Sequence, residues 1–382
     1  YRGTMKQDNG GYDLGFSDTG GMGGIGSGIT EARFEAPYLS WEIEEKKNYG
    51  IDLGLFDNRI DLQVDYFNNK RKSILLQRNT VSNVTGFQQM PWQNFGIVKN
   101  HGVDASLTLN QKIGRVNLSA RGNFTFARNE IIEYDQVPQV YPWLEKRGTR
   151  LNSNKLYIAE GLYTYDDFII NGEGLNRTYE LKPGVVSGLS SGVRPGDIKY
   201  KDQNGDGIID AEDEIAIGRS NYPELVYGLN LNAEWKGFDI TFFFQGAALA
   251  DFYYNGYLAF PYIEGRGGAL LEHHIGNTWT PENPKAEFPR LYYGGNANNQ
   301  LFSSFWMRNG SYLRLKNVEI GYDFKKLLLS KVSEIQGLRL YFSGSNLLTW
   351  SQIKYFDPEL RSTDGSAYPQ MKTFVFGANI TF

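Results

Sequence analysis

Strict alternation of apolar and polar residues most limits what this chain can fold into, and it is clearest over residues 227–245. Every second side chain is apolar or aromatic from residue 227 to 235, and again from residue 238 to 244. A repeat of two places successive side chains on opposite faces of a β-strand. Because Lys236-Gly237 supplies a short turn between the two stretches, the sequence predicts a β-hairpin with one apolar face.

The same alternation recurs along the chain. Further strands are predicted at residues 51–55, 60–66, 103–109, 116–126, 312–324, 338–345 and 374–382. Leu313 and Leu315 are out of phase with Val318, and a β-bulge near Asn317 would restore the phase. We expect about ten strands of roughly 8 to 14 residues, which is longer than strands of soluble sheets usually are.

The composition excludes several classes of protein. The chain has 25 Tyr, 24 Phe and 7 Trp, and disordered chains lack such aromatic content. With no Cys it has no disulfide scaffold and no thiolate metal site. Its net charge of −4 arises from evenly spread charges, so we expect no nucleic acid partner. No stretch approaches the ~20 apolar residues of a spanning helix.

The predicted strands are separated by short turns and by two long connections, at residues 127–224 and 249–306. This asymmetry is typical of outer-membrane barrels and favours an all-β, antiparallel transmembrane β-barrel. A large soluble β-sandwich or propeller also alternates and remains open as an alternative. Aromatic residues near strand ends could form interfacial girdles or could cap an ordinary core: Trp41, Trp92, Trp235, Trp306, Trp350, Tyr66, Tyr227 and Tyr322.

Residues 202–213 have the spacing of a twelve-residue calcium loop. Oxygen ligands fall at its positions 1, 3, 5, 7, 9 and 12, with Gly207 at the sharp turn. The predicted ligands are Asp202, Asn204, Asp206, the carbonyl of Ile208, Asp210 and Asp213. No amphipathic helix flanks the loop, so a structural Ca²⁺ ion is expected rather than a helix-loop-helix sensor. The alternative is a solvated acidic turn.

Other signals indicate no chemistry. The Gly-rich stretch at residues 20–28 lacks the strand and helix of a phosphate-binding loop, and we interpret it as a loop. His273 and His274 are interpreted as loop residues as well. No nucleophile and no acid-base pair stands out, so we expect no enzyme.

Several ordered motifs carry a family resemblance. They are residues 194–210 (RPGDIKYKDQNGDGIID), 223–228 (PELVYG), 312–318 (YLRLKNV), 346–350 (NLLTW), 357–359 (DPE) and 376–382 (FGANITF). Residues 375–382, which include the last of these motifs, also resemble the terminal signal recognised by the outer-membrane insertion machinery. Together the motifs resemble the SusC/RagA-type TonB-linked outer-membrane transporters of Bacteroidetes.

That resemblance implies the C-terminal part of a 22-stranded barrel with a plugged lumen. The chain begins at Tyr1 without an initiator Met, and we expect it to be a fragment in which plug and N-terminal extension have no counterpart. The implied function is TonB-dependent import of oligosaccharides or peptides across the outer membrane. The implied partners are a SusD-like surface lipoprotein, the TonB complex through the missing N-terminal part, and outer-membrane lipid.

Substrate-binding residues cannot be assigned from the sequence. One hypothesis places sugar-stacking aromatics in the long connections, and the other packs them loop against loop: Tyr163, Tyr165, Phe168, Tyr253, Tyr254 and Tyr257. Two other functions remain open, a passive porin and a secreted calcium-stabilised glycan-binding β module.

Overall fold

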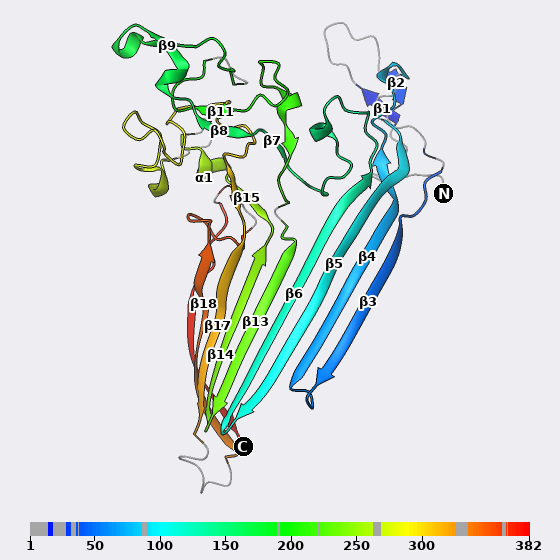
Figure 1. The fold of residues 1–382 in the computed structure, drawn as a ribbon, viewed down its shortest axis with the longest axis vertical. Coiled ribbons are helices and arrows are strands. Elements are labelled where there is room, and N and C mark those ends of the chain that lie inside the picture. The colour runs from blue at the N-terminus through cyan, green and yellow to red at the C-terminus, as the bar shows by residue number, and fades with distance from the viewer. Residues whose placement is uncertain are drawn as a thin grey trace. The chain divides into compact units, whose positions relative to one another are not determined.

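A nine-stranded antiparallel sheet dominates the computed structural model of the chain (Figure 1). The structure describes residues 14–17, 28–31, 36, 38–85, 90–188, 192–220, 222–262, 269–324, 335–360, 364 and 366–382. The sheet has the order β19-β18-β17-β14-β13-β6-β5-β4-β3. Its strands are β3 (Ile43–Leu55), β4 (Ile60–Gln77), β5 (Trp92–Ile113), β6 (Val116–Glu133), β13 (Leu225–Trp235), β14 (Phe238–Ala248), β17 (Tyr312–Asp323), β18 (Gly337–Ser351) and β19 (Thr373–Thr381).

Outside this sheet, the short strands pair two by two, and the helices are short. The small strands are β1 (Leu14–Ser17), β2 (Gly28–Glu31), β7 (Lys155–Leu156), β8 (Ala159–Leu162), β9 (Phe168–Asn171), β10 (Thr178–Leu181), β11 (Ile198–Tyr200), β12 (Ile215–Ala216), β15 (Asp251–Tyr253) and β16 (Met307–Asn309). The helices are α1 (Gly256–Ala259) and the 3₁₀ turns η1 (Asn83–Thr85), η2 (Pro142–Leu144), η3 (Tyr165–Asp167), η4 (Gly174–Asn176), η5 (Ala211–Asp213) and η6 (Glu272–His274). None of the helices described is long and apolar enough to cross a membrane. Most of the Gly-rich stretch at residues 20–28 lies outside the described residues.

The predicted hairpin of residues 227–245 is confirmed as β13 and β14, paired from Trp235 and Phe238 at the turn to Leu225 and Ala248 at the other end. The predicted bulge is also confirmed, because the register between β14 and β17 shifts at Phe243 and Phe244. Several strands are longer than predicted, and β5 reaches 22 residues. About 9 to 11 residues suffice for a strand to cross a bilayer, so β5 is longer than one crossing requires.

The chain divides into two compact units. The first contains residues 1–48, 67–101 and 128–151. Within it, buried Asp135 accepts hydrogen bonds from the backbone N–H groups of Asn79 and Thr80, at 2.6 and 3.1 Å, and from Nε of Arg78 at 3.0 Å. Burial alone would raise the pKa of Asp135, but these hydrogen bonds outweigh it and lower the pKa. The carboxylate thus fixes the connection that follows β4.

The second unit contains residues 49–66, 102–127 and 152–382, and includes part of each strand of the sheet. The short turns and the long connections alternate along the chain, so they lie at opposite ends of the antiparallel strands (Figure 1). We call these the turn end and the loop end. At the loop end the connections of residues 152–224 and 249–311 bury a core of their own around Trp306, Tyr200 and Phe288.

Candidate functional site

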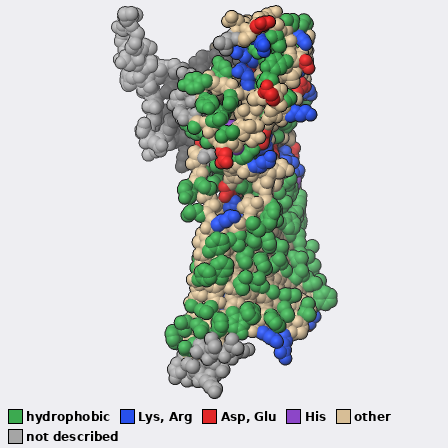
Figure 2. Space-filling model, turned by 90° about the vertical axis from the view of Figure 1, so that its left-hand side faces the viewer, with side chains coloured by type: hydrophobic (Ala, Val, Ile, Leu, Met, Phe, Trp, Pro, Cys, Tyr) green, Lys and Arg blue, Asp and Glu red, His purple; other side chains and the backbone are tan. Residues whose placement is uncertain are grey.

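The sheet has one apolar and one polar face, as its register shows. One row of directly paired residues is apolar across six strands: Leu118, Ala233, Ile240, Ile320, Phe342 and Phe376. The next row is Ser119, Asn232, Thr241, Glu319, Ser343 and Val375, which is polar at five of six positions. The apolar face is open to its surroundings, with Phe376 at 83% exposure. Figure 2 shows hydrophobic side chains gathered over the strands.

The polar face carries an ion-pair cluster toward the turn end. Arg339 on β18 reaches Asp239 on β14 through Nε at 3.0 Å and Glu319 on β17 at 2.6 Å. Its guanidinium lies over Gly321, where a Cβ would collide with Nη2 of Arg339. The glycine therefore leaves the space that lets one arginine join three strands.

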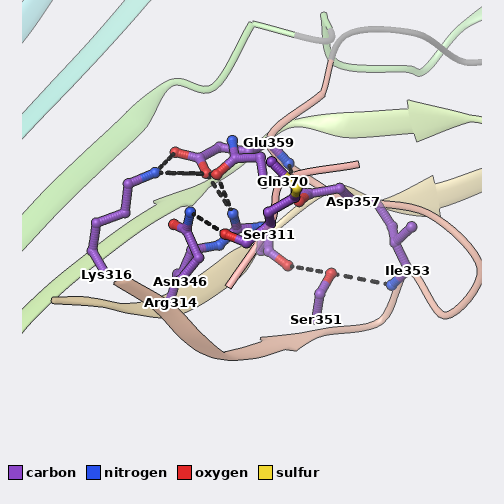
Figure 3. A network of polar contacts seen from close by, with 10 residues as sticks. Ser311, Arg314, Lys316, Asn346, Ser351, Ile353, Asp357, Glu359 and Gln370 are labelled. Atoms are coloured by element: carbon purple, nitrogen blue, oxygen red, sulfur yellow. Dashed lines mark hydrogen bonds and ion pairs between the residues drawn. The ribbon is translucent and has the colours of Figure 1, made fainter. Parts of the chain in front are cut away.

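A second polar network lies at the loop end of β17 and β18 (Figure 3). Nη2 of Arg314 donates to Asp357 at 2.5 Å, and Nη1 lies 2.8 Å from Glu359. Nζ of Lys316 donates to both carboxylate oxygens of Glu359, each at 3.1 Å. Two cations on the strand thus hold two anions of the connection between β18 and β19, with Gln370 completing the network by accepting from Arg314 at 2.6 Å.

The bulge positions the two cations. Strict alternation along the strand would place Arg314 and Lys316 on the same face in the same way. Lys316 is instead the extra residue of the bulge, which the pairing with β14 skips. On the β18 side Asn346 adopts φ 55° next to the same irregularity, and its Nδ2 donates to the carbonyl of Met371 at 3.1 Å. A bulge re-aims side chains at such points, and here it brings both cations to Glu359.

Arg314 has almost no access to solvent, with its side chain 3% exposed. Its two anionic partners are also largely shielded, so the pairs sit in a medium that screens charge poorly. Removing one partner of a buried pair leaves an uncompensated charge, which is strongly destabilising. The network therefore fixes the connection between β18 and β19 to the polar face. The motifs at residues 312–318 and 357–359 supply it.

The motif at residues 194–210 forms a second buried centre in the connections. Asp197 is fully buried and pairs with Arg290, whose Nη2 donates at 3.1 Å. The same carboxylate accepts from Nδ2 of Asn296 at 2.8 Å and Nδ2 of Asn299 at 2.9 Å. Gly196 has φ +91° and packs against Trp279, so a side chain there would be both strained and obstructed. We call this group the Asp197 centre.

The aromatic residues proposed to stack on sugars are largely inaccessible. Tyr163, Phe168 and Tyr254 are at most 3% exposed, so the stacking hypothesis is wrong for them. Tyr163 donates its hydroxyl to the carbonyl of Val186 at 2.7 Å and meets Phe168 edge to ring. These residues pack loop against loop because burying aromatic area stabilises connections that lack long strands.

The remaining aromatics of that hypothesis also contact protein. Tyr253 donates to the carbonyl of Leu301 at 3.2 Å, and Tyr165 lies 5.8 Å from the ring of Trp279. Tyr257 is half-buried within α1. A small hollow beside Arg290 and Asn299 has a volume of about 30 Å³, which suits water rather than a sugar. Substrate contacts therefore remain unassigned.

One of the predicted girdle residues lies elsewhere. Trp306 is fully buried in the connections and donates Nε1–H to the carbonyl of Asn299 at 2.8 Å, so the girdle hypothesis is wrong for it. Its position ahead of β17 gave a strand-end signal, but the residues before β17 fold into the loop core. Trp235 and Trp350 lie on β13 and β18 and are half exposed on the apolar face.

The predicted calcium ligands share one loop, with their carboxylates turned to its backbone. Asp202 accepts from the N–H groups of Gly205 and Gly207, at 2.6 and 2.7 Å. Asp206 accepts from the N–H of Ile208 at 2.8 Å, and Asn204 donates to Asp206 at 3.0 Å.

The C-terminal residues of this loop are anchored in the same way. Asp213 is fully buried and accepts from the N–H groups of Gln203 and Asp210, at 2.7 and 2.8 Å. Asp210 accepts from the N–H of Glu212 and starts η5. Among the described residues no group of three or more His, Cys, Asp or Glu side chains is arranged to hold a metal ion. Calcium binding stays a prediction.

His273 and His274 lie in η6, as loop residues, and join two connections. His273 stacks on Tyr355 with ring centroids 4.4 Å apart, and Tyr355 donates to Glu287 at 2.9 Å. His274 is 1% exposed. Burial, with a smaller contribution from neighbouring His273, lowers the pKa of His274 to about 4.

Sequence reasoning missed the Arg314 network and the Asp197 centre, although it found the motifs that supply them. Arg314 and Asp357 are 43 residues apart, and no short-range pattern joins them. The available signal was a charged residue between two leucines in a strand, which marks a buried or lumen-facing position.

Comparison with known proteins identifies the family. The family described as "TonB dependent receptor-like, beta-barrel" matches residues 1–213. TonB-dependent receptor P26 of Formosa agariphila is 28% identical over 374 residues, which cover 93% of this chain and 36% of the relative. TonB-dependent receptor SusC of Bacteroides thetaiotaomicron is 25% identical over 355 residues, covering 90% of this chain and 32% of SusC.

A solved structure agrees. The RagAB peptide transporter matches 94% of this chain and 37% of the solved chain, with 26% identity and a TM-score of 0.65. The chain therefore spans about a third of the length of its relatives, and the resemblance to SusC and RagA is confirmed. It belongs to the TonB dependent receptor-like β-barrel family, whose members are receptors of the bacterial outer membrane and not enzymes.

Proposed function

We propose that this chain forms part of a barrel that imports oligosaccharides or peptides across the outer membrane in a TonB-dependent way, with a SusD-like lipoprotein over its loop end. The similarity to SusC and to the RagAB peptide transporter over at least nine-tenths of the chain carries the proposal. The TonB contact would lie in the part of the longer relatives that this chain does not span.

The two faces of the sheet support the assignment. The apolar face is exposed along several neighbouring strands, which in a soluble protein would promote association. This argues against a secreted glycan-binding module. The polar face, with Arg339 and Arg314, would line the lumen. In outer-membrane barrels short turns face the periplasm, so the loop end would face outward.

Uptake measurements test the activity. Cells lacking the gene are complemented with the full-length protein and supplied with labelled oligopeptides in one arm and labelled oligosaccharides in the other. Import should appear in one arm and stop when TonB is deleted or the proton gradient is collapsed. Import that persists without TonB would instead indicate the passive porin, and import in neither arm would contradict the proposal.

The proposed SusD-like partner is tested separately. Pull-down of the full-length protein from membranes solubilised in mild detergent should recover a surface lipoprotein of SusD type. A bare barrel in several detergents would count against the partner without affecting the uptake result.

A structural Ca²⁺ ion in the loop of residues 202–213 is part of the proposal. Its support is the order of oxygen-bearing side chains and their gathering in a single loop. Binding would require Asp202 and Asp206 to exchange some backbone hydrogen bonds for the ion, and the ion would brace the loop and take no part in transport.

A further inference from the structure

The apolar face contains a groove that no side chain of the described residues fills. It crosses β5, β6, β13 and β14, and its volume is about 370 Å³. Its walls include Leu109, Leu118, Leu231, Ile240 and Phe242, and its floor includes Ala120 and Ala233. Gln111, Ser119 and Asn232 also line it. The surface exposed within the groove is almost entirely apolar.

The register explains the depression. Ala120 on β6 pairs with Leu231 on β13, and Ala233 pairs with Leu118 on β6 and Ile240 on β14. The two alanines are therefore diagonal neighbours between larger side chains. Because the alanine side chain is shorter than that of leucine or phenylalanine, the apolar surface is hollowed along this diagonal.

The groove lies close to the turn end. Leu118 follows the turn of residues 114–115 by a few residues, and Ala233 precedes the turn of residues 236–237 in the same way. Arg115 and Lys236 are exposed in these turns. Nζ of Lys236 lies 5.1 Å from the ring centroid of Trp235, which itself belongs to the apolar face.

The acidic residues near the groove lie on the opposite, polar face of the sheet. Glu234 accepts from Nδ2 of Asn117 at 3.4 Å on the polar face, and Asp239 binds Arg339 there. The turn end of the groove therefore presents two cations and an interfacial tryptophan beside an apolar channel. In a membrane this combination matches a phosphate headgroup with an attached acyl chain.

We propose that the groove is a binding site for one phospholipid of the periplasmic leaflet, with an acyl chain on Ala120 and Ala233 and its phosphate near Arg115 and Lys236. The proposal rests on the barrel orientation given under the proposed function. Lipid tails surround the whole apolar face, so burial alone would not retain one lipid. Retention arises from close packing in the groove and from the two cations.

Native mass spectrometry of the full-length transporter tests the site. The protein is released from micelles doped with phosphatidylglycerol, and the fraction that keeps one lipid is measured. Ala120→Leu combined with Ala233→Leu fills the groove and should lower that fraction at least fivefold. Ala105→Leu adds the same bulk on β5, on the face of Leu109 but outside the groove, and should leave retention unchanged.

The headgroup contact has its own variants. Arg115→Glu combined with Lys236→Glu should lower retention severalfold, whereas Arg59→Glu in the turn between β3 and β4 should not. These surface variants test the proposal even if the groove-filling protein does not assemble, which unheated gel mobility reveals. Equal retention in all variants, or displacement of phosphatidylglycerol by lipid A as the tighter ligand, would overturn the proposal. If the native protein retains the lipid but imports neither labelled substrate, the result contradicts the proposed function and leaves the lipid site standing.

Discussion

Arg314 holds two carboxylates from a position that water hardly reaches. Replacing it with Met keeps an unbranched apolar stem but removes the cation at Asp357 and leaves Lys316 as the cation at Glu359. Losing one partner of a buried ion pair costs about 3–5 kcal/mol. We expect Arg314→Met to release the connection of residues 352–372 and make it sensitive to protease on intact cells, while the barrel stays assembled.

Lys316 is the matched control for this prediction. Its side chain is 26% exposed, so Lys316→Met should have a much smaller effect on cleavage. Arg314→Lys should not restore protection, because an ammonium cannot form the fork that reaches two carboxylates. Equal protection of Arg314→Met and the native protein would show that the network does not secure this connection.

Asp206 tests whether the loop of residues 202–213 binds calcium. If the ion is present, chelation should loosen residues 196–218 and raise their cleavage rate, and Asp206→Ala should do so even in calcium. Glu212→Gln removes a charge from a position that is not a predicted ligand and should behave like the native loop. Calorimetric titration gives the direct measurement, and identical cleavage with and without chelator would contradict calcium binding.

His274 should make the loop core sensitive to acid. Its folded pKa of about 4 lies below the ordinary value of 6.5, so the unfolded form binds more protons between these values. Stability should therefore fall as the pH drops from about 6.5 to about 4. Hydrogen exchange in residues 269–311, corrected for intrinsic rates, should show lower protection at acidic pH. His274→Gln should reduce this pH-dependent loss of protection. A pH-independent protection factor would contradict this assignment.

At the scale of elements, Gly321 and Arg339 should act as one unit across β14, β17 and β18. A Cβ at position 321 pushes the guanidinium away from Asp239 and Glu319, so Gly321→Ala should destabilise the barrel by about 1 kcal/mol. In the background of Arg339→Ala the same substitution should cost nothing further. Urea unfolding of the four proteins measures the coupling, and additive effects would show that the glycine has another role.

The strands in the membrane could be predicted, but their extensions could not. Residues 60–66 alternate because one face meets lipid, whereas residues 67–77 continue β4 with a mostly polar run that has no period of two. Pairing with neighbouring strands, not side-chain pattern, sets that extension. Likewise the sequence indicated that residues 202–213 form a turn-rich loop, but not that Asp213 would be buried as its anchor.

At the scale of the whole molecule, the sheet has two edges. Among the described residues β3 and β19 each pair on one side only, and a barrel requires both edges to pair. We expect the full-length protein to supply the missing strands and to migrate faster on gels before heating than after. Identical mobility of heated and unheated samples would contradict a closed barrel.

The Asp197 centre couples the evolution of one long connection to that of the other, because its residues come from both. Its carboxylate comes from residues 152–224, while Arg290, Asn296 and Asn299 come from residues 249–311. A hybrid gene whose crossover falls between these segments would combine an anchor with foreign partners. Exchange of loops among such receptors should therefore succeed when both connections are inherited together, and the pair forms a single module for diversification.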